Sequence, residues 1–322
     1  MIMILRFSLM IFIAALLSGC GVQGTVEGRV ADAHARNDGP PVWVVKDFDS
    51  TLYLFGTVHL LPTDSSSWMR DDLKDIFDKS GTVFFEADSS RDGQVKASVL
   101  THELGFYSSG ERLSDGFDRY QLRLLEAAAL SSDLPLAALE NMKPWFAAEV
   151  ITLAAAEKEG LSADISADEA LKSRAARLRK NVQYLDTIES QIRASSDQPN
   201  FVQDIIITDT LEGYNSIGGN LRRAAEDWAV GRISFLAQNV KETKSRSPEL
   251  YQSLFTDRNI KWSKTLTRHM EDSGTSFAAI GIGHMLGDDS LIKHLKNSGY
   301  EVKRYYAFQG DPVINIINLP EN

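Results

Sequence analysis

Two histidines and one glutamate occupy positions from which they could do chemistry together. His59 and His284 each come three residues after a glycine, Gly56 and Gly281, and each follows an apolar segment typical of a strand. Glu86 lies inside a third apolar segment, where burying an unpaired carboxylate would be costly. If these strands are neighbours, the three side chains form a donor set suited to a divalent transition metal, with positions left for water and substrate. Such an ion would acidify the water and polarise a carbonyl.

Each of these residues also has a simpler interpretation. A histidine at one strand end is more often a hydrogen-bonded part of the scaffold, and the carboxylate of Glu86 could face solvent from the other side of its strand. The matched pair of G-x-x-H segments favours a site, because ligands of open α/β sheets bind at the carboxyl ends of the strands. The spacing specifies neither the metal nor the reaction.

Strands are predicted near both ends of the chain. Residues 42–45 and 52–55 are rich in β-branched and aromatic side chains and are separated by turn-forming residues, which predicts a hairpin. The pattern also predicts strands at 82–87, 277–282 and 301–306, and helices at 68–79 and 290–297.

Between these strands, residues 117–270 are dominated by Ala, Leu, Glu, Lys and Arg, which favour helices. We therefore expect one domain over residues 42–310, with an α/β (α+β) fold. Its central mixed sheet would be built from N- and C-terminal strands, with a long helical insertion at 117–270. A separate all-helical second domain is the competing interpretation.

The N-terminus is typical of an exported lipoprotein. Residues 1–19 read as a signal peptide, with one basic residue and a short apolar stretch, and they end in the lipobox-like sequence LSG before Cys20. We expect Cys20 to carry the lipid and residues 20–41, which are small and polar, to form a flexible tether. An uncleaved membrane helix and an ordinary secretory signal are the alternatives. Residues 311–322 are expected to be a C-terminal tail.

The composition limits the kinds of binding partner that we expect for this protein. Cys20 is the only cysteine, so its acylation would leave no thiol for a disulfide, a nucleophile or a metal ligand. A formal net charge of -10 argues against nucleic-acid binding. The expected membrane contact is the lipid anchor. The residue after the cysteine is Gly21 rather than the Asp that commonly retains lipoproteins at the inner membrane, so the outer membrane of the bacterial envelope is favoured.

Several motifs together resemble the TraB/GumN family. They extend over residues 42–306 and occur in the family's order. They are 54–62 (LFGTVHLLP), 85–88 (FEAD), 143–145 (KPW), 257–259 (DRN), 281–287 (GIGHMLG) and 299–302 (GYEV). The two histidine-containing motifs are the specific ones, whereas the helical middle is not.

The resemblance implies a mixed α/β fold with a helical insertion and a site at the two G-x-x-H motifs. The family includes the Tiki proteins, which are metal-dependent proteases supported by manganese or cobalt, and it is related to the erythromycin-esterase and ChaN-like group. By this resemblance His59, Glu86 and His284 would bind the metal or act in catalysis, with zinc also possible. Arg258 and Asn259 would face the same cleft, where the guanidinium could hold a substrate carboxylate or stabilise an oxyanion. A surface ion pair is the alternative for Arg258.

Two positions depart from the family's pattern. Asp257 stands where the family often has Glu before its Arg-Asn pair, and Asp186 stands in a segment that is frequently Leu-Glu-Thr. Both changes shorten a carboxylate side chain by one methylene, which puts the reach of these two residues in doubt.

Three functions are consistent with the sequence. The first is a metal-dependent hydrolase of the envelope, acting on a peptide or protein, with Glu86 as a metal ligand or general base. The second is a non-catalytic binding lipoprotein for a metal, a haem-like ligand or a glycan. The third is a structural envelope protein that uses the helical insertion as its interaction surface.

Overall fold

The computed structural model describes residues 39–64, 68–108 and 110–306. The signal segment, Cys20, most of the expected tether and the C-terminal tail lie outside the described residues. The last three residues of the expected tether, 39–41, are described and buried, and the carbonyl oxygen of Pro41 accepts a hydrogen bond from the backbone of Gly56. The packed part of the described chain therefore includes the residues directly before the first strand.

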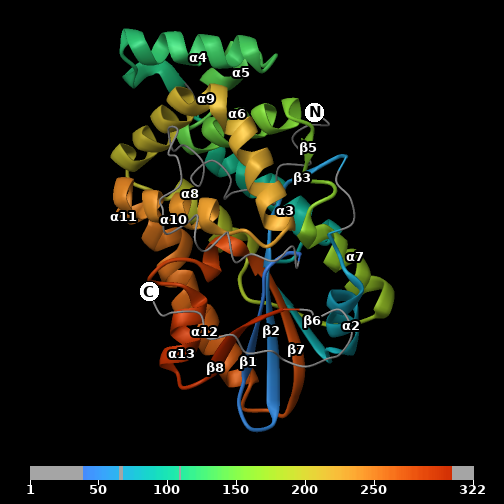
Figure 1. Ribbon diagram of the computed structural model, residues 1–322. Helices are drawn as coiled ribbons and strands as arrows, with labels where there is room; N and C mark the ends of the chain where they lie inside the picture. Colours follow the sequence, from blue (N-terminus) through green and yellow to red (C-terminus); the bar gives the residue numbers. More distant parts are fainter. Residues whose placement is uncertain (1–38, 65–67, 109, 307–322) are drawn as a thin grey trace.

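A mixed sheet forms the base of the domain (Figure 1). In the described residues it has six strands in the order β6-β4-β7-β2-β1-β8, and β1 alone runs opposite to the other five. The strands are β1 (Val42–Lys46), β2 (Ser50–Thr57), β4 (Thr82–Phe85), β6 (Asn181–Tyr184), β7 (Gly274–Gly281) and β8 (Glu301–Tyr305). A separate small pair joins β3 (Leu61–Pro62) to β5 (Leu161–Ser162).

Strands β2 and β7 lie side by side at the centre and are parallel, with Thr57 opposite Gly281 at their carboxyl ends. Strand β4 lies on the other side of β7, also parallel, with Phe85 opposite Ala279. Both faces of the centre are covered, so its inner strands are buried almost throughout, as expected for parallel strands. The ends of β2, β4 and β7 therefore meet at one edge of the sheet.

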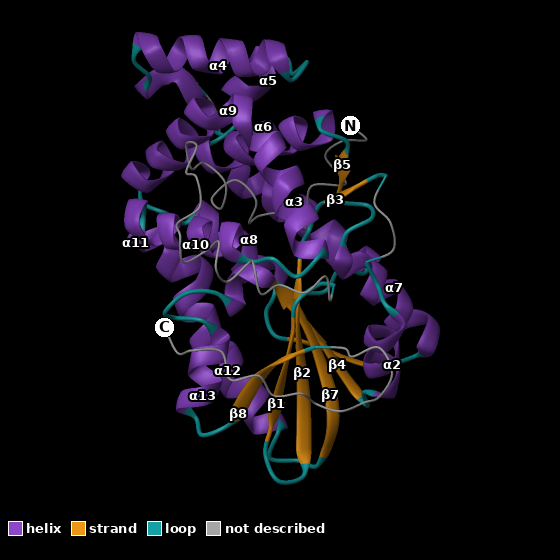
Figure 2. Cartoon of the chain, in the orientation of Figure 1, coloured by secondary structure: helices purple, strands orange, loops and turns teal. Residues whose placement is uncertain are grey.

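Helices cover the two faces of the sheet. Figure 2 shows α12 (Asp257–His269) and α13 (Leu291–Asn297) to one side, with α2 (Asp71–Lys79) and α7 (Ala167–Leu178) to the other. Amphipathic helix α2 buries Leu73 and Phe77. The ring of Phe77 packs against Phe277 of β7, with centroids 5.1 Å apart. These contacts join the sheet and its helices into one core.

Apart from α7 and α12, most of the helical insertion lies beyond the carboxyl edge of the sheet, with α4 (Arg119–Ser131) and α5 (Leu136–Glu140) farthest from it (Figure 1). Its longest helix, α9 (Asn200–Ala229), packs along α6 (Pro144–Lys158). Trp228, near the end of α9, is fully buried and donates a hydrogen bond from Nε1 to the carbonyl oxygen of Gly56 in β2, at 2.7 Å. This bond fixes the insertion to the strand that leads to His59.

The remaining helical elements of the described residues are short or intermediate in length, and the π-helical turn η4 directly precedes α12. They are α3 (Arg91–Gly105), η3 (Leu113–Gly116), α8 (Ile188–Ser196), α10 (Ser234–Arg246), α11 (Pro248–Tyr251), η4 (Gln252–Thr256) and η5 (Ile282–Met285). No helix among the described residues is long and apolar enough to cross a bilayer.

The predicted mixed sheet with a helical insertion is confirmed, and so is the hairpin of β1 and β2. The region expected to be almost wholly helical contains two short strands: β5, which pairs with β3, and β6, which lies at the edge of the main sheet. Strand β6 has the sequence Asn-Val-Gln-Tyr and is mostly exposed. An exposed edge strand does not need the apolar pattern by which the other strands were predicted.

Candidate functional site at the carboxyl edge of the sheet

His59 follows the end of β2 and is held by a carboxylate from the helical insertion. Its Nδ1 lies 3.0 Å from Oδ2 of Asp168 in the first turn of α7. The hydroxyl of Thr57 donates to the other oxygen of Asp168 at 2.9 Å. This pairing favours the tautomer with its proton on Nδ1, which leaves the lone pair on Nε2. Burial alone would lower the pKa of His59, but the Asp168 carboxylate outweighs it and raises that pKa above its usual value.

Glu86 follows directly after β4 and accepts three hydrogen bonds. Its Oε1 accepts from the backbone N–H of Gly281 at 2.7 Å. Its Oε2 accepts from Arg258 at 2.8 Å and from the side chain of Gln191 at 3.0 Å. Burial alone would raise the pKa of Glu86, but the Arg258 guanidinium and the neighbouring groups outweigh it and hold that pKa below its usual value. The side chain is therefore a carboxylate at neutral pH.

His284 lies in the short helix η5 that follows β7, and both of its ring nitrogens have partners. Nδ1 is 2.7 Å from Oδ1 of Asn259, whose amide nitrogen donates to the carbonyl oxygen of Asp289 at 2.7 Å. That second bond orients the amide so that Nδ1 of His284 donates, and Nε2 then accepts from Arg258 at 3.3 Å. Burial and the Arg258 charge lower the pKa of His284 to about 3, so the ring is neutral.

Arg258 contacts both Glu86 and His284. Its guanidinium contacts Glu86, His284 and also Asp186, whose Oδ2 lies 3.1 Å from Nε. It stacks over the ring of Trp262 at 4.4 Å and has only 6% of its side chain exposed. Because its donors are already directed at these partners, the geometry gives Arg258 the role of positioning Glu86 and His284.

The three predicted ligands surround the end of β7 at Gly281. A Cβ atom added there would lie 3.0 Å from Oε1 of Glu86, 3.6 Å from Nε2 of His59 and 3.8 Å from Cδ2 of His284. The backbone of Gly281 has a φ of -48°, which any residue can adopt. Glycine is needed here for space, because a side chain would fill the region on which the three groups converge.

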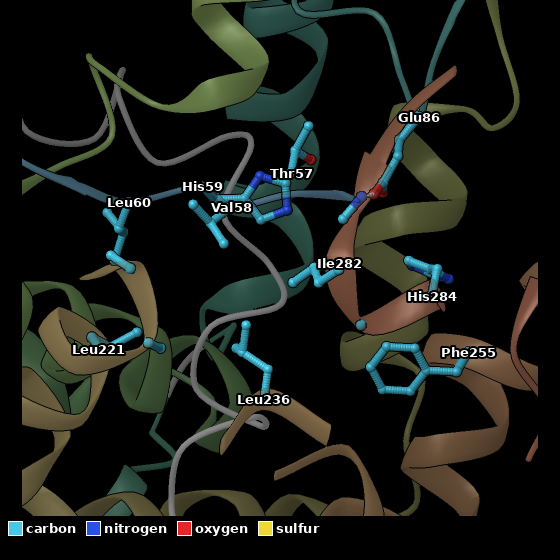
Figure 3. Close-up of a pocket in the computed structure, with 14 residues that line it drawn as sticks. Thr57, Val58, His59, Leu60, Glu86, Leu221, Leu236, Phe255, Ile282 and His284 are labelled. Atoms are coloured by element: carbon cyan, nitrogen blue, oxygen red, sulfur yellow. Dashed lines mark hydrogen bonds between the residues drawn. The ribbon is translucent and has the colours of Figure 1, made fainter. Parts of the chain in front are cut away.

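This region opens into a cavity of about 80 Å³. Figure 3 shows His59, Glu86 and His284 at the cavity, with Leu221 and Leu236 on the side away from the last two. Most of the lining is apolar, and Arg258 and Asn259 do not contribute to it. A ligand in the cavity would therefore contact the two imidazoles and the glutamate directly. Arg258 and Asn259 would act on it only through their contacts with these three side chains.

The residue types fit a divalent metal. Two imidazoles and one ionised carboxylate lie around Gly281, and these are side chains that transition metals prefer as ligands. His284 is neutral, whereas His59, whose pKa is raised, would release any proton on Nε2 when it bound an ion. The described part of the chain contains no group of three His, Cys, Asp or Glu side chains placed so that it could hold a metal ion. Arg258 contacts both Glu86 and Nε2 of His284. A metal would bind that nitrogen only in competition with Arg258.

The structure thus brings together His59, Glu86 and His284, with Arg258 and Asn259 supporting them from outside the cavity. Of the two shortened acids, Asp186 still reaches Arg258, and it also binds Lys261 at 2.8 Å. Asp257 is exposed and accepts only a long bond from the side chain of Gln252, at 3.4 Å.

Sequence reasoning missed three contributors: Asp168, Thr57 and Gln191. Asp168 follows the N-cap Ser166, whose side chain accepts a bond from Glu169, so its position reads as an ordinary acidic residue in the first turn of a helix. Gln191 is a buried amide in α8. Neither residue has a local sequence signal that relates it to a histidine or a glutamate far away in the chain.

Fold and site together define a class: a mixed α/β protein with a helical insertion and a histidine–glutamate cluster where the sheet's parallel strands end. A family model described as "TraB/PrgY/gumN family" matches residues 41–304, and the chain belongs to that family. No curated protein and no solved structure matched the chain.

Proposed function

We propose that this protein is a metal-dependent hydrolase that acts on peptide bonds. The observation that supports this most is the convergence of His59, Glu86 and His284 around Gly281, at the mouth of a cavity. The two imidazoles and the carboxylate would hold the ion. A bound divalent metal would supply Lewis acidity, which lowers the pKa of a water and polarises a carbonyl. Manganese, cobalt and zinc are the candidates.

The chain's own residues prepare this donor set. Asp168 holds the ring of His59 with Nε2 toward the cavity, and Asn259 holds the ring of His284. Such partners orient metal-binding histidines and raise their basicity. Glu86 has a lowered pKa and three hydrogen-bond donors, which makes it a poor proton acceptor. We therefore assign it to metal binding rather than to general base catalysis.

The test is hydrolysis of a quenched-fluorescence peptide library by purified protein, with and without each metal. We expect metal-dependent cleavage that falls at least about 100-fold in His284→Ala and in Glu86→Gln, as for loss of a group essential to the chemistry. A matched control is His102→Ala, an exposed histidine in α3. Metal or ligand binding without any cleavage would favour the binding lipoprotein instead.

We also propose that the protein is lipid-anchored through Cys20, with its folded domain in the bacterial envelope and the outer membrane as its site. The support is the lipobox-like sequence and the apolar stretch before it. Metabolic labelling with a palmitate analogue tests this. We expect labelling of the wild type and none of Cys20→Ser, and equal labelling of the two would contradict the anchor.

A further inference from the structure

The cavity at the site has two chemically different sides. One side carries His59, Glu86 and His284. The other is formed by Leu221, Ala224 and Ala225 of α9 and Leu236 of α10, a surface that we call the apolar wall. Figure 3 shows Leu221 and Leu236 separated from Glu86 and His284 across the cavity, with Ile282 between them.

Spacing on α9 explains why the wall is continuous. Leu221, Ala224 and Ala225 are three and four residues apart, so they lie on one face of the helix. The two arginines between them point elsewhere: Arg222 pairs with Asp64 and Glu226, and the guanidinium of Arg223 stacks on Phe235. The wall therefore presents no charge to the cavity.

Among the described lining residues the charged or titratable groups are limited to the histidine and glutamate cluster. A charged or amide side chain placed against the wall would lose its water without gaining a partner there, which is unfavourable. An aliphatic side chain would gain from burial instead. The two alanines also matter, because their small side chains leave room that a larger residue would fill.

The wall is held rigidly relative to the cluster. Trp228, one helical turn beyond Ala224, donates to the carbonyl oxygen of Gly56 at 2.7 Å, and Gly56 lies in the strand that leads to His59. A second close contact backs the helix: a Cβ on Gly218 would lie 2.4 Å from the carbonyl oxygen of Ala155 in α6. A rigid wall facing fixed catalytic groups is what a specificity subsite requires.

We propose that the apolar wall is a subsite for one uncharged aliphatic side chain of the substrate, next to the bond that is cleaved. The position of that side chain relative to the cleaved bond rests on the proposed hydrolase function. Binding of the side chain itself does not, because it depends only on the wall.

Binding of blocked amino acids to the full protein tests the subsite, with and without zinc. The probes are N-acetyl-leucinamide, N-acetyl-asparaginamide and N-acetyl-lysinamide, followed by ligand-observed NMR. We expect the leucine compound to bind at least about tenfold more tightly than the other two, the size of effect that one apolar pocket contributes. Equal binding of all three, or no binding, would overturn the subsite.

Ala225→Phe fills the cavity and should weaken binding of N-acetyl-leucinamide at least about tenfold. Ala127→Phe, at an exposed position in α4, is the control and should bind normally. The wild-type series decides the subsite even if Ala225→Phe does not fold. Selective binding of the leucine compound without peptide cleavage would reject the hydrolase and support the subsite. Cleavage of peptides without any preference for aliphatic residues would support the hydrolase and reject the subsite.

Discussion

The carboxylate of Asp168 lies 3.0 Å from Nδ1 of His59, and through this contact the helical region orients a group of the sheet. His59 lies two residues after the end of β2, whereas Asp168 lies in the first turn of α7, which packs against the sheet. Burial alone would raise the pKa of Asp168, but the His59 charge outweighs it and lowers that pKa, so the carboxylate stays ionised. The side chain is therefore suited to hold the His59 ring in one orientation.

Replacing Asp168 should weaken metal binding without removing a ligand. Asp168→Asn keeps the size of the side chain but loses the charge that orients His59 and increases its basicity. We expect zinc affinity, measured by isothermal titration calorimetry, to fall roughly 10–100-fold, as for other partners of metal-binding histidines. Asp164→Asn, at an exposed position in the loop before α7, is the matched control. Unchanged zinc affinity in Asp168→Asn would show that His59 does not depend on this contact.

Gly281→Ala tests whether open space at the end of β7 is required. The added methyl would lie 3.0 Å from Oε1 of Glu86 and would also displace any ion from the region that His59 faces. We expect metal binding to be lost while the protein remains folded, because the backbone conformation suits alanine. Gly219→Ala on α9, where no atom lies within 4 Å of the added carbon, should bind metal normally and gain about 0.5–1 kcal/mol of stability.

Arg258 should be a major contributor to stability in the metal-free protein. Arg258→Met leaves the buried carboxylates of Glu86 and Asp186 without their shared cation. We expect the free energy of unfolding, from urea titration, to fall by about 3–5 kcal/mol. Lys261→Ala removes the exposed partner of the same Asp186 and should cost less than about 1 kcal/mol. Similar small losses in both variants would contradict the positioning role.

Glu149, in the middle of α6, should make stability depend on pH. It is buried, Oε1 has no hydrogen-bond partner, and burial raises its pKa from 4.5 to about 8. The folded state therefore holds a proton that the unfolded state releases. The resulting stabilisation is complete below the unfolded pKa and is lost as the pH rises toward the folded one.

Relative to Glu149→Gln, the wild type should therefore lose up to about 1.4 kcal/mol of stability per pH unit within that window. Urea unfolding at about pH 5.5 and about pH 7.5 measures the difference. Glu157→Gln, at an exposed position on the same helix, provides the control and should track the wild type. A constant difference between wild type and Glu149→Gln would mean that Glu149 does not hold a proton across this range.

The sheet could be predicted because most of its strands are buried, and burial leaves an apolar pattern in the sequence. Strand β6 could not, because it is only four residues long, lies exposed at an edge and stands within a stretch whose composition favours helices. The same reasoning applies to the site. His59 and His284 were identifiable because glycine and histidine recur at equal spacing at two strand ends, and those strands are neighbours.

The residues that support the site could not be predicted from the sequence. Asp168 of α7 and Gln191 of α8 reach His59 and Glu86 only in the folded protein, through contacts that no local pattern encodes. The effect of a shortened side chain also depends on distance in the folded protein. Asp186 is shorter than the glutamate expected at its position by resemblance, yet it still contacts Arg258.

The central claim is that the two strand ends form one metal site. The most direct measurement is calorimetric titration of manganese, cobalt and zinc into the wild type, His59→Ala, His284→Ala and the control His102→Ala. We predict one metal bound per wild-type and control protein, and at least about 100-fold weaker binding in each of the two site variants, because each removes a direct ligand. Equal binding by all four proteins, or binding by none, would contradict a shared site.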